Sequence, residues 1–197
     1  MILEYPGVVG NGEIYLDVMK AICGDTSDKS MVDLMCHHAP YTPMLGFKER
    51  TYIDIQNRGT DHVSELDKFI IDDVVKGEWD RYLGQVDVTI CSDGIEHLSI
   101  NDALLLLKKM QTSSEKQILF TPLGECSITN DNDPDSHKSG WRPEILNLLL
   151  VDQWAYIVFP NFHPSLNVGA FFFWCCDDIL EDFERVKLEL KNKQWTK

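Results

Sequence analysis

The stretch VDVTICSDGIEHLSINDALLLLKK, residues 86–109, decides the fold, because it joins a strand, a polar turn and a helix without slack. The apolar positions of its first part suit a strand covered on both faces, and they are Val86, Val88, Ile90 and Cys91. The run stops at a polar turn, Ser92 to Gly94. The stretch therefore predicts a buried strand that leads directly into a turn.

A helix follows this turn. Its apolar residues recur at helical spacing, at Ala103, Leu104, Leu106, Leu107 and Met110. Ser99, with Asp102 three residues later, marks the start of the helix. Strand, turn and helix in this order form half of a βαβ unit. Ligands bind beyond the carboxyl ends of strands in an open α/β sheet, so Asp93, Glu96 and His97 are the first candidates for a functional role.

Composition and charge limit the class of protein. The chain has 197 residues, 44% hydrophobic and 25% charged, which is ordinary for a globular protein and predicts one domain over residues 1–197. Its formal net charge is -14, with 18 basic against 32 acidic residues. Such a balance repels a phosphate backbone, so we expect no non-specific binding to nucleic acid.

The sequence carries no signature of a membrane protein. No apolar run reaches the roughly 20 residues of a membrane-spanning helix. The N-terminus lacks a basic region ahead of an apolar block, so we expect no signal peptide and a cytoplasmic location. The six cysteines show neither a CxxC pair nor zinc-finger spacing, and Cys91, Cys175 and Cys176 fall within apolar strand patterns. We therefore expect reduced, structural thiols.

The rest of the chain predicts helices and strands in alternation. Helices are expected over residues 13–22, 42–48, 74–83, 142–150 and 178–193, and strands over 31–34, 51–55, 69–71, 117–121, 155–159 and 168–176. We expect an N-terminal arm and helix over 1–30, a core sheet with its helices over 31–176, and a C-terminal helix over 177–197. The polar loop 129–140 and the helix 13–22 are candidates for a lid over the strand ends.

The order of these elements, with several local motifs, resembles the class I S-adenosylmethionine-dependent methyltransferases. The matching segments are Val32 to Leu34 at the first strand, Asp54 ending the second, Asp73 after the third, DGIEHL (93–98) after the fourth, SHKSGWRPEIL (136–146), PNFHP (160–164) and VGAFFFW (168–174). Together they cover the chain from about Met31 to Cys176. The resemblance implies an α/β fold, a Rossmann-like three-layer sandwich with a seven-stranded, mostly parallel sheet whose last strand is antiparallel.

The resemblance also implies S-adenosylmethionine as the cofactor. The residues that it assigns to cofactor binding are Asp33, Met35, His37, Asp54, Ile55, Asp73, Val74, Asp93 and Gly94. Asp54 follows Asp33 by about 20 residues, the separation that places a carboxylate within reach of ribose hydroxyls. Asp73 would accept from the adenine amino group, with Ile55 and Val74 as apolar walls. The alternative is that Asp54 and Asp73 only end strands, as aspartate often does.

The first turn departs from the family pattern. The family has a glycine-rich turn, D-x-G-x-G-x-G, whose backbone approaches the cofactor closely, and this chain has Met35, His37 and Ala39 at the three glycine places. A Cβ at each place narrows the path, and a positive φ there costs about 1 to 2 kcal/mol. Two readings follow. Either the cofactor binds in an altered pose with His37 or His38 lining the pocket, or the fold is retained and methyl transfer is lost.

Histidines gather at the same predicted rim of the sheet. Those that fall there are His37, His38, His97, His137 and His163. A single histidine is more often a hydrogen-bonded structural residue than a catalyst, but convergence favours a titrating group near neutral pH. His97 is the first candidate for a general base and His163 the second. Cys36 and the histidines beside it lack metal-ligand spacing, so no metal site is predicted.

The residues in the turn after the fourth strand limit the classes of methyl acceptor that we expect. Methyl transfer mainly needs a nucleophile in line with the sulfonium methyl group. Family members that methylate exocyclic amines of DNA bases carry N/D-P-P-Y there, where this chain has DGIE (93–96). We expect a small-molecule or protein acceptor, with no DNA and no membrane partner, and the oligomeric state is left open. The competing hypotheses are a methyltransferase-like binding or scaffolding protein without turnover and, fitting DGIEHL poorly, a nicotinamide-dependent oxidoreductase.

Overall fold

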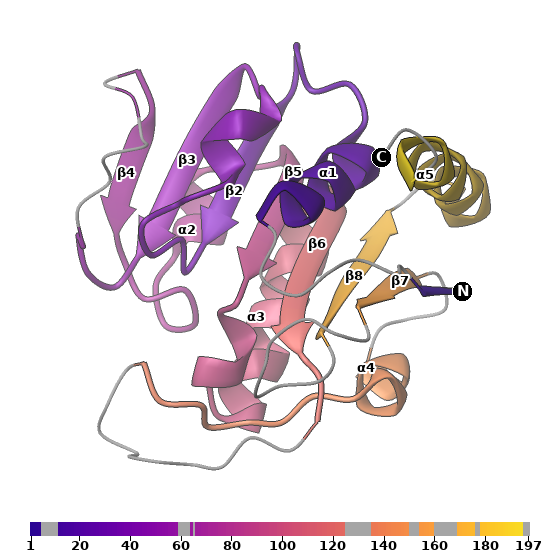
Figure 1. Ribbon diagram of the computed structural model, residues 1–197. Coiled ribbons are helices and arrows are strands. Elements are labelled where there is room, and N and C mark those ends of the chain that lie inside the picture. The colour runs from indigo at the N-terminus through magenta and orange to yellow at the C-terminus, as the bar shows by residue number, and fades with distance from the viewer. Residues whose placement is uncertain are drawn as a thin grey trace.

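Strands and helices alternate along most of the chain in the computed structural model, which describes residues 1–4, 12–58, 64, 66–124, 135–149, 154–159, 169–175 and 178–194 (Figure 1). The strands are β1 (Ile2–Glu4), β2 (Ser30–Leu34), β3 (Glu49–Asp54), β4 (Lys68–Ile71), β5 (Val86–Ser92), β6 (Ser114–Pro122), β7 (Trp154–Phe159) and β8 (Gly169–Cys175). The α-helices are α1 (Gly12–Cys23), α2 (Trp79–Tyr82), α3 (Ile100–Ser113), α4 (Pro143–Leu149) and α5 (Ile179–Gln194), and the short 3-10 helices are η1 (Thr42–Leu45) and η2 (Ile95–His97).

The described strands form one sheet, in the order β1-β7-β8-β6-β5-β2-β3-β4. β8 runs antiparallel to both β6 and β7, and the other strand pairs are parallel. The predicted seven-stranded, mostly parallel sheet with a reversed last strand is thus confirmed for β2 to β8. The additional strand, β1, pairs with β7 and places Ile2 opposite Tyr156. The sequence predicts only an arm here, because a three-residue strand is too short for a periodic signal.

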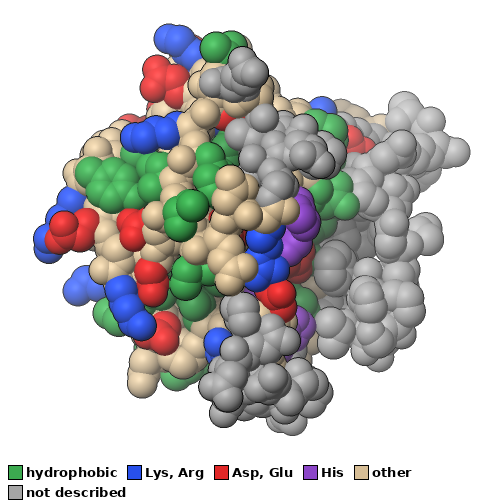
Figure 2. Space-filling view, turned by 90° about the vertical axis from the view of Figure 1, so that its left-hand side faces the viewer, with side chains coloured by type: hydrophobic (Ala, Val, Ile, Leu, Met, Phe, Trp, Pro, Cys, Tyr) green, Lys and Arg blue, Asp and Glu red, His purple; other side chains and the backbone are tan. Residues whose placement is uncertain are grey.

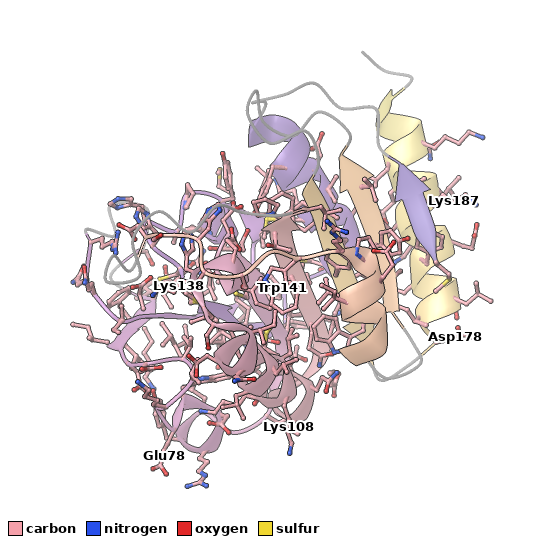
Figure 3. The ribbon with its side chains drawn as sticks, turned by 90° about the horizontal axis from the view of Figure 1, so that it is seen from below. Glu78, Lys108, Lys138, Trp141, Asp178 and Lys187 are labelled. Atoms are coloured by element: carbon pink, nitrogen blue, oxygen red, sulfur yellow. The ribbon has the colours of Figure 1, made fainter. Side chains whose placement is uncertain are left out.

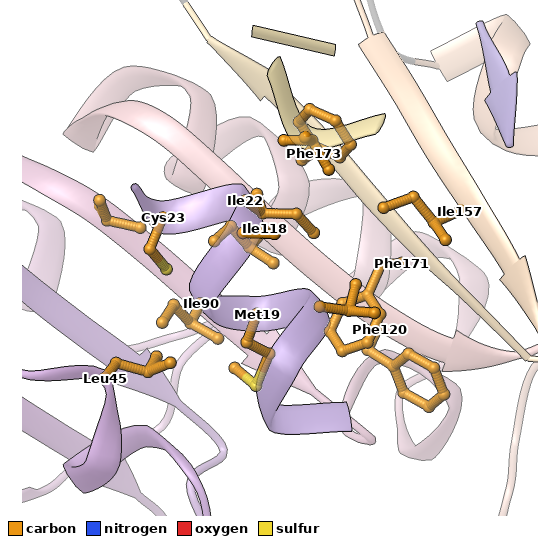
Figure 4. Close-up of a cluster of buried hydrophobic side chains, with 14 of the residues drawn as sticks. Met19, Ile22, Cys23, Leu45, Ile90, Ile118, Phe120, Ile157, Phe171 and Phe173 are labelled. Atoms are coloured by element: carbon orange, nitrogen blue, oxygen red, sulfur yellow. The ribbon is translucent and has the colours of Figure 1, made fainter. Parts of the chain in front are cut away.

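Helices cover both faces of the sheet, which makes the three layers of the fold (Figure 1). On one face α1 and α5 pack over a buried apolar cluster that includes Met19, Ile22, Ile118, Phe171 and Phe173 (Figure 4). On the other face α3 packs over a second cluster that includes Leu106, Met110, Leu119, Phe172 and Trp174. Successive residues of β8 alternate between the clusters, so both faces of this strand are buried.

The segment after β4 differs from the prediction of a helix over residues 74–83. It is a turn followed by α2, which is helical only over Trp79–Tyr82. Asp73 Oδ1 accepts hydrogen bonds from the backbone N–H groups of Val75 (2.9 Å) and Lys76 (3.0 Å). An aspartate that binds the backbone in this way stabilises a turn in place of a helix, which is why the helical pattern was misleading here.

The other helices lie close to their predicted bounds. The helix expected over residues 42–48 is the shorter η1, which ends where Gly46 adopts a φ of 80°. Within the described ranges, no helix combines the length and the apolar character that crossing a membrane requires.

Candidate functional site

A cavity of about 470 Å³ opens beyond the carboxyl ends of β2, β3 and β5. β2 and β5 are neighbours, and the chain proceeds from β2 towards one edge of the sheet and from β5 towards the other. The cavity therefore lies at the topological switch point, where open α/β sheets bind ligands, and its volume is typical of a small-molecule site. Figure 3 views the molecule from this end and shows the segment with Lys138 and Trp141 crossing in front of the sheet.

Most of the predicted cofactor residues line this cavity. They are Asp33, Met35, His37, Asp54, Ile55, Asp73, Val74 and Asp93. Gly94 is buried beside the lining, against Cys91 and Met35. His97, the first candidate base, lines the cavity, whereas His163 lies outside the described residues. The lining also holds residues that sequence analysis did not single out, among them Tyr15, Met19, Thr42, Arg58, Asp72, Ser92, Asp135 and Lys138.

The turn after β2 has the backbone conformation of a glycine-rich loop although it contains no glycine. Met35, His37 and Ala39 adopt φ angles of 57°, 49° and 45°. Left-handed conformations of this kind cost a residue with a Cβ about 1 to 2 kcal/mol each. Backbone hydrogen bonds hold the turn, from Cys36 N–H to the carbonyl of Ile53 (3.2 Å) and from Ala39 N–H to the carbonyl of Cys36 (2.7 Å). The alternate places of the glycine motif thus keep the glycine backbone and carry side chains on it.

Asp54, at the end of β3, fastens this turn. Its Oδ2 accepts a hydrogen bond from the backbone N–H of His37 (2.9 Å), and its Oδ1 accepts one from the N–H of Gln56 (3.1 Å). The residue is only 7% exposed, yet it lines the cavity. Each carboxylate oxygen has a further lone pair, so Asp54 can still accept hydrogen bonds from a ligand.

Asp73, after the end of β4, uses one carboxylate oxygen to accept hydrogen bonds from the backbone that follows it. Its Oδ1 holds the turn that precedes α2 through Val75 and Lys76, which agrees with the simpler view that this aspartate ends a strand. The apolar walls expected beside it are present, since Ile55 and Val74 both line the cavity. Ile55 is 57% exposed and can cover one side of a ring.

Asp33 is buried beneath the turn. It is 3% exposed, and Thr42 Oγ1 donates a hydrogen bond to its Oδ2. Burial raises the pKa of Asp33 from 3.8 to about 7, against the lowering effect of the Thr42 hydrogen bond, and the charge of Asp54 adds to the rise. This carboxyl is therefore poised between its neutral and its charged form near neutral pH.

His97, which lines the cavity, lies close to Glu96 and His137, which are not among the lining residues. Each offers one ligand atom, and these atoms all lie within 4.8 Å of one another. The ring centroids of the two histidines are 4.9 Å apart, and the rings meet at 73°. Nδ1 of His97 is buried and has no hydrogen-bond partner within the described ranges. Burial, and then the neighbouring His137, lower the pKa of His97, which favours a neutral imidazole.

Glu96 is the most deeply buried member of this cluster. It is 1% exposed, and Thr121 Oγ1 donates a hydrogen bond to its Oε2 (3.0 Å). Burial, and then the charge of Asp93, raise the pKa of Glu96 to about 8. Two imidazoles and one carboxylate are a common donor set for divalent cations, so the cluster has the chemistry to hold one, which the sequence spacing did not reveal.

His137 lies close to Glu96 and His97 because the segment 135–141 is hydrogen-bonded to η2. The backbone N–H groups of Lys138 and Ser139 both donate to the carbonyl of Glu96, at 2.7 and 3.1 Å. Main-chain hydrogen bonds thus hold together the two backbone segments that carry the three ligand groups.

Two contacts between distant parts of the chain frame the cavity. Arg58, after β3, forms an ion pair with Asp135 at 2.7 Å. The hydroxyl of Tyr15, in α1, hydrogen-bonds the hydroxyl of Ser92 and donates to Asp93 Oδ2 at 3.5 Å. The partners lie 77 or 78 positions apart in the sequence, so no local sequence signal could have found them.

On the face of the molecule seen from the side of β4, histidine side chains are exposed beside acidic and basic side chains (Figure 2).

No protein-family model matches the sequence, and no curated protein matches it. Solved structures do match. The methyltransferase domain of bacterial CtHen1 superposes with a TM-score of 0.63 at 16% identity, over 83% of this chain and 98% of that one. A SAM-dependent methyltransferase from Archaeoglobus fulgidus gives a TM-score of 0.64 at 14% identity, over 84% and 95%.

A third similar structure is the magnesium protoporphyrin IX methyltransferase ChlM from Synechocystis PCC 6803 with bound SAH. It gives a TM-score of 0.62 at 11% identity, over 84% of this chain and 83% of that one. Likeness at such low identity is evidence of shared architecture. The chain has the Rossmann-like fold of the class I S-adenosylmethionine-dependent methyltransferases.

Proposed function

We propose that this chain binds S-adenosylmethionine in the cavity at the switch point and transfers its methyl group to a hydroxyl or amine of a small-molecule or protein acceptor. The observation that carries the proposal is one cavity with a carboxylate at the end of β3, Asp54, and another after β5, Asp93, on either side of β2. Similar folds hold the cofactor product, as in N-methyltransferase NodS from Bradyrhizobium japonicum with SAH.

The proposed pose lays the nucleoside over β3 and the amino-acid tail towards β5. Asp54 accepts hydrogen bonds from the ribose hydroxyls with its remaining lone pairs, and Ile55 and Val74 contact the adenine ring. Asp73 offers its second oxygen to the adenine amino group. Asp93 accepts a hydrogen bond from the ammonium group of the tail. The sulfonium charge activates the methyl group, so the protein needs mainly to bind the cofactor and to align the acceptor with its methyl group.

The acceptor is placed beside η2. His97 is the proposed base, because its lowered pKa leaves the imidazole free to take a proton from a hydroxyl or an amine. His163 remains the second candidate. Glu96 and His137 lie next to His97, outside the cavity lining. As an alternative to the base role of His97, the three side chains would hold a divalent cation, which would lower the pKa of an acceptor hydroxyl.

The test is a calorimetric titration of the purified chain with S-adenosylmethionine and with S-adenosylhomocysteine. Saturable binding of both is expected. Asp54→Ala should weaken it by roughly 1.5 to 3 kcal/mol, because paired hydroxyl contacts are lost. Thermal unfolding of the variant checks that it is folded, since Asp54 also holds the His37 backbone. Asp28→Ala, at an exposed position in a turn outside the cavity lining, is the matched control and should leave both affinities unchanged.

A binding or scaffolding protein without turnover is the alternative, and the Cβ-bearing turn over residues 35–39 favours it. That alternative predicts no saturable binding of either cofactor form at millimolar concentration. The absence of saturable binding would contradict our proposal. The same titration with NAD addresses the oxidoreductase hypothesis and should give no binding.

A further inference from the structure

The side chain of Met35 lies at the point where the two halves of the sheet diverge. Met35 directly follows β2, and Gly94 follows β5 after a short turn. These strands are parallel neighbours, with Leu34 opposite Cys91. Met35 and Gly94 therefore stand on the two sides of the crevice at the switch point, where a ligand approaches the backbone most closely.

Met35 fills the space between these two sides. A Cβ built on Gly94 would lie 3.1 Å from Met35 Cβ and 3.2 Å from Met35 Sδ, so the thioether rests against the glycine. Met35 also lines the cavity and packs against the apolar cluster under α3. Its φ of 57° is one that a glycine adopts without strain. A glycine at this place would keep the backbone and leave the crevice open beside Gly94.

We propose that Met35 determines which part of a nucleoside cofactor this cavity accepts, by occupying the room that an amino-acid tail needs. The inference rests on the proposed function. In the pose with Asp54 at the ribose and Asp93 at the ammonium group, the path between them passes Met35. A tail can enter only when the thioether moves off Gly94, and that displacement lowers the affinity for ligands with a tail. The nucleoside half is unaffected, because Asp54, Ile55 and Val74 lie on the far side of β2 from Gly94.

The experiment compares three ligands on four proteins. The ligands are S-adenosylmethionine, S-adenosylhomocysteine and 5′-methylthioadenosine, which has the nucleoside and the sulfur but no amino-acid tail. The proteins are the unchanged chain, Met35→Leu, Met35→Ala and Met35→Gly. The unchanged chain should bind 5′-methylthioadenosine nearly as tightly as S-adenosylhomocysteine. Met35→Gly should tighten both tailed ligands by about tenfold and leave 5′-methylthioadenosine unchanged. Met35→Ala should lie between, and Met35→Leu, which keeps the bulk, should resemble the unchanged chain.

Three outcomes are distinguishable. The affinity for the two ligands with a tail, divided by the affinity for 5′-methylthioadenosine, should rise from Met35→Leu to Met35→Ala to Met35→Gly. Such a rise supports the assignment. If all three ligands bind and this affinity ratio is the same in the unchanged chain and in Met35→Gly, the assignment of Met35 is wrong. The proposed function would still stand in that case. No binding of any ligand to any of the four proteins overturns both, and the thermal unfolding midpoint of each protein shows that loss of fold is not the cause.

Discussion

Asp33 is a single carboxyl whose burial ties the stability of the chain to pH. Its pKa is about 7 in the folded protein against an ordinary value of 3.8, so the folded state favours the protonated form. The contribution of this proton to stability is fully present below about pH 3.8 and is lost as pH rises through about 7. Ionising Asp33 above that pH costs the folded state on the order of a few kcal/mol.

Asp33→Asn should remove this loss, because the amide stays neutral and still accepts the hydrogen bond from Thr42. The free energy of unfolding of the variant, minus that of the unchanged chain, should therefore increase between pH 4 and pH 7 and level off above it. Urea denaturation at a series of pH values measures the difference. Asp28→Asn, at an exposed position, controls for the change of charge. A difference that stays constant with pH would contradict the role given to Asp33.

Residues 35–39 show what the sequence could and could not predict about a single turn. The glycine motif sets three places that need positive φ, and the motif alone anticipated strain at Met35, His37 and Ala39, which the structure has. The direction of the Met35 side chain was beyond prediction. It depends on the position of Gly94, which is far along the chain and adjacent only because β2 pairs with β5.

At the scale of elements, long periodic segments were predictable and short ones were not. α3 and β8 each bury a regular pattern of apolar residues, and their positions follow from it. β1 is too short to carry a pattern, and α2 lost most of its predicted length to the turn that Asp73 stabilises. The strand-end carboxylates line one cavity, because parallel strands end at a common edge of the sheet.

The ligand cluster arises from two elements that the sequence does not connect. η2 supplies Glu96 and His97, and the segment 135–141 supplies His137 through main-chain hydrogen bonds to the Glu96 carbonyl. If the cluster holds a divalent cation, Mn²⁺ should raise the thermal unfolding midpoint, since an ion that binds the folded state stabilises it. His137→Ala should abolish most of this rise. His38→Ala, at an exposed histidine, should retain it, and an equal rise in both variants would place the ion elsewhere.

At the scale of the whole molecule, the charge of the chain and that of the cavity have the same sign. The formal net charge is -14. The acidic residues that line the cavity are Asp33, Asp54, Asp72, Asp73, Asp93 and Asp135, and the lysine and arginine residues are Lys138 and Arg58. The negative charge of the chain and that of the cavity lining both attract a cation and repel a polyanion, which agrees with the proposal of an acceptor other than DNA.

This acidic field should discriminate between the two forms of the cofactor. S-adenosylmethionine carries a methyl group and with it a sulfonium charge, both of which S-adenosylhomocysteine lacks, and the rest of the two molecules is the same. Carboxylates around the cavity therefore favour the methyl donor over its product, and salt screens that preference because the Debye length falls as ionic strength rises. The affinity ratio of donor to product should fall several-fold between about 20 mM and about 500 mM NaCl. Calorimetry at both salt concentrations measures it. A ratio that does not change with salt would mean that the contacts of the sulfonium group, and not the field of the whole molecule, decide which form is bound.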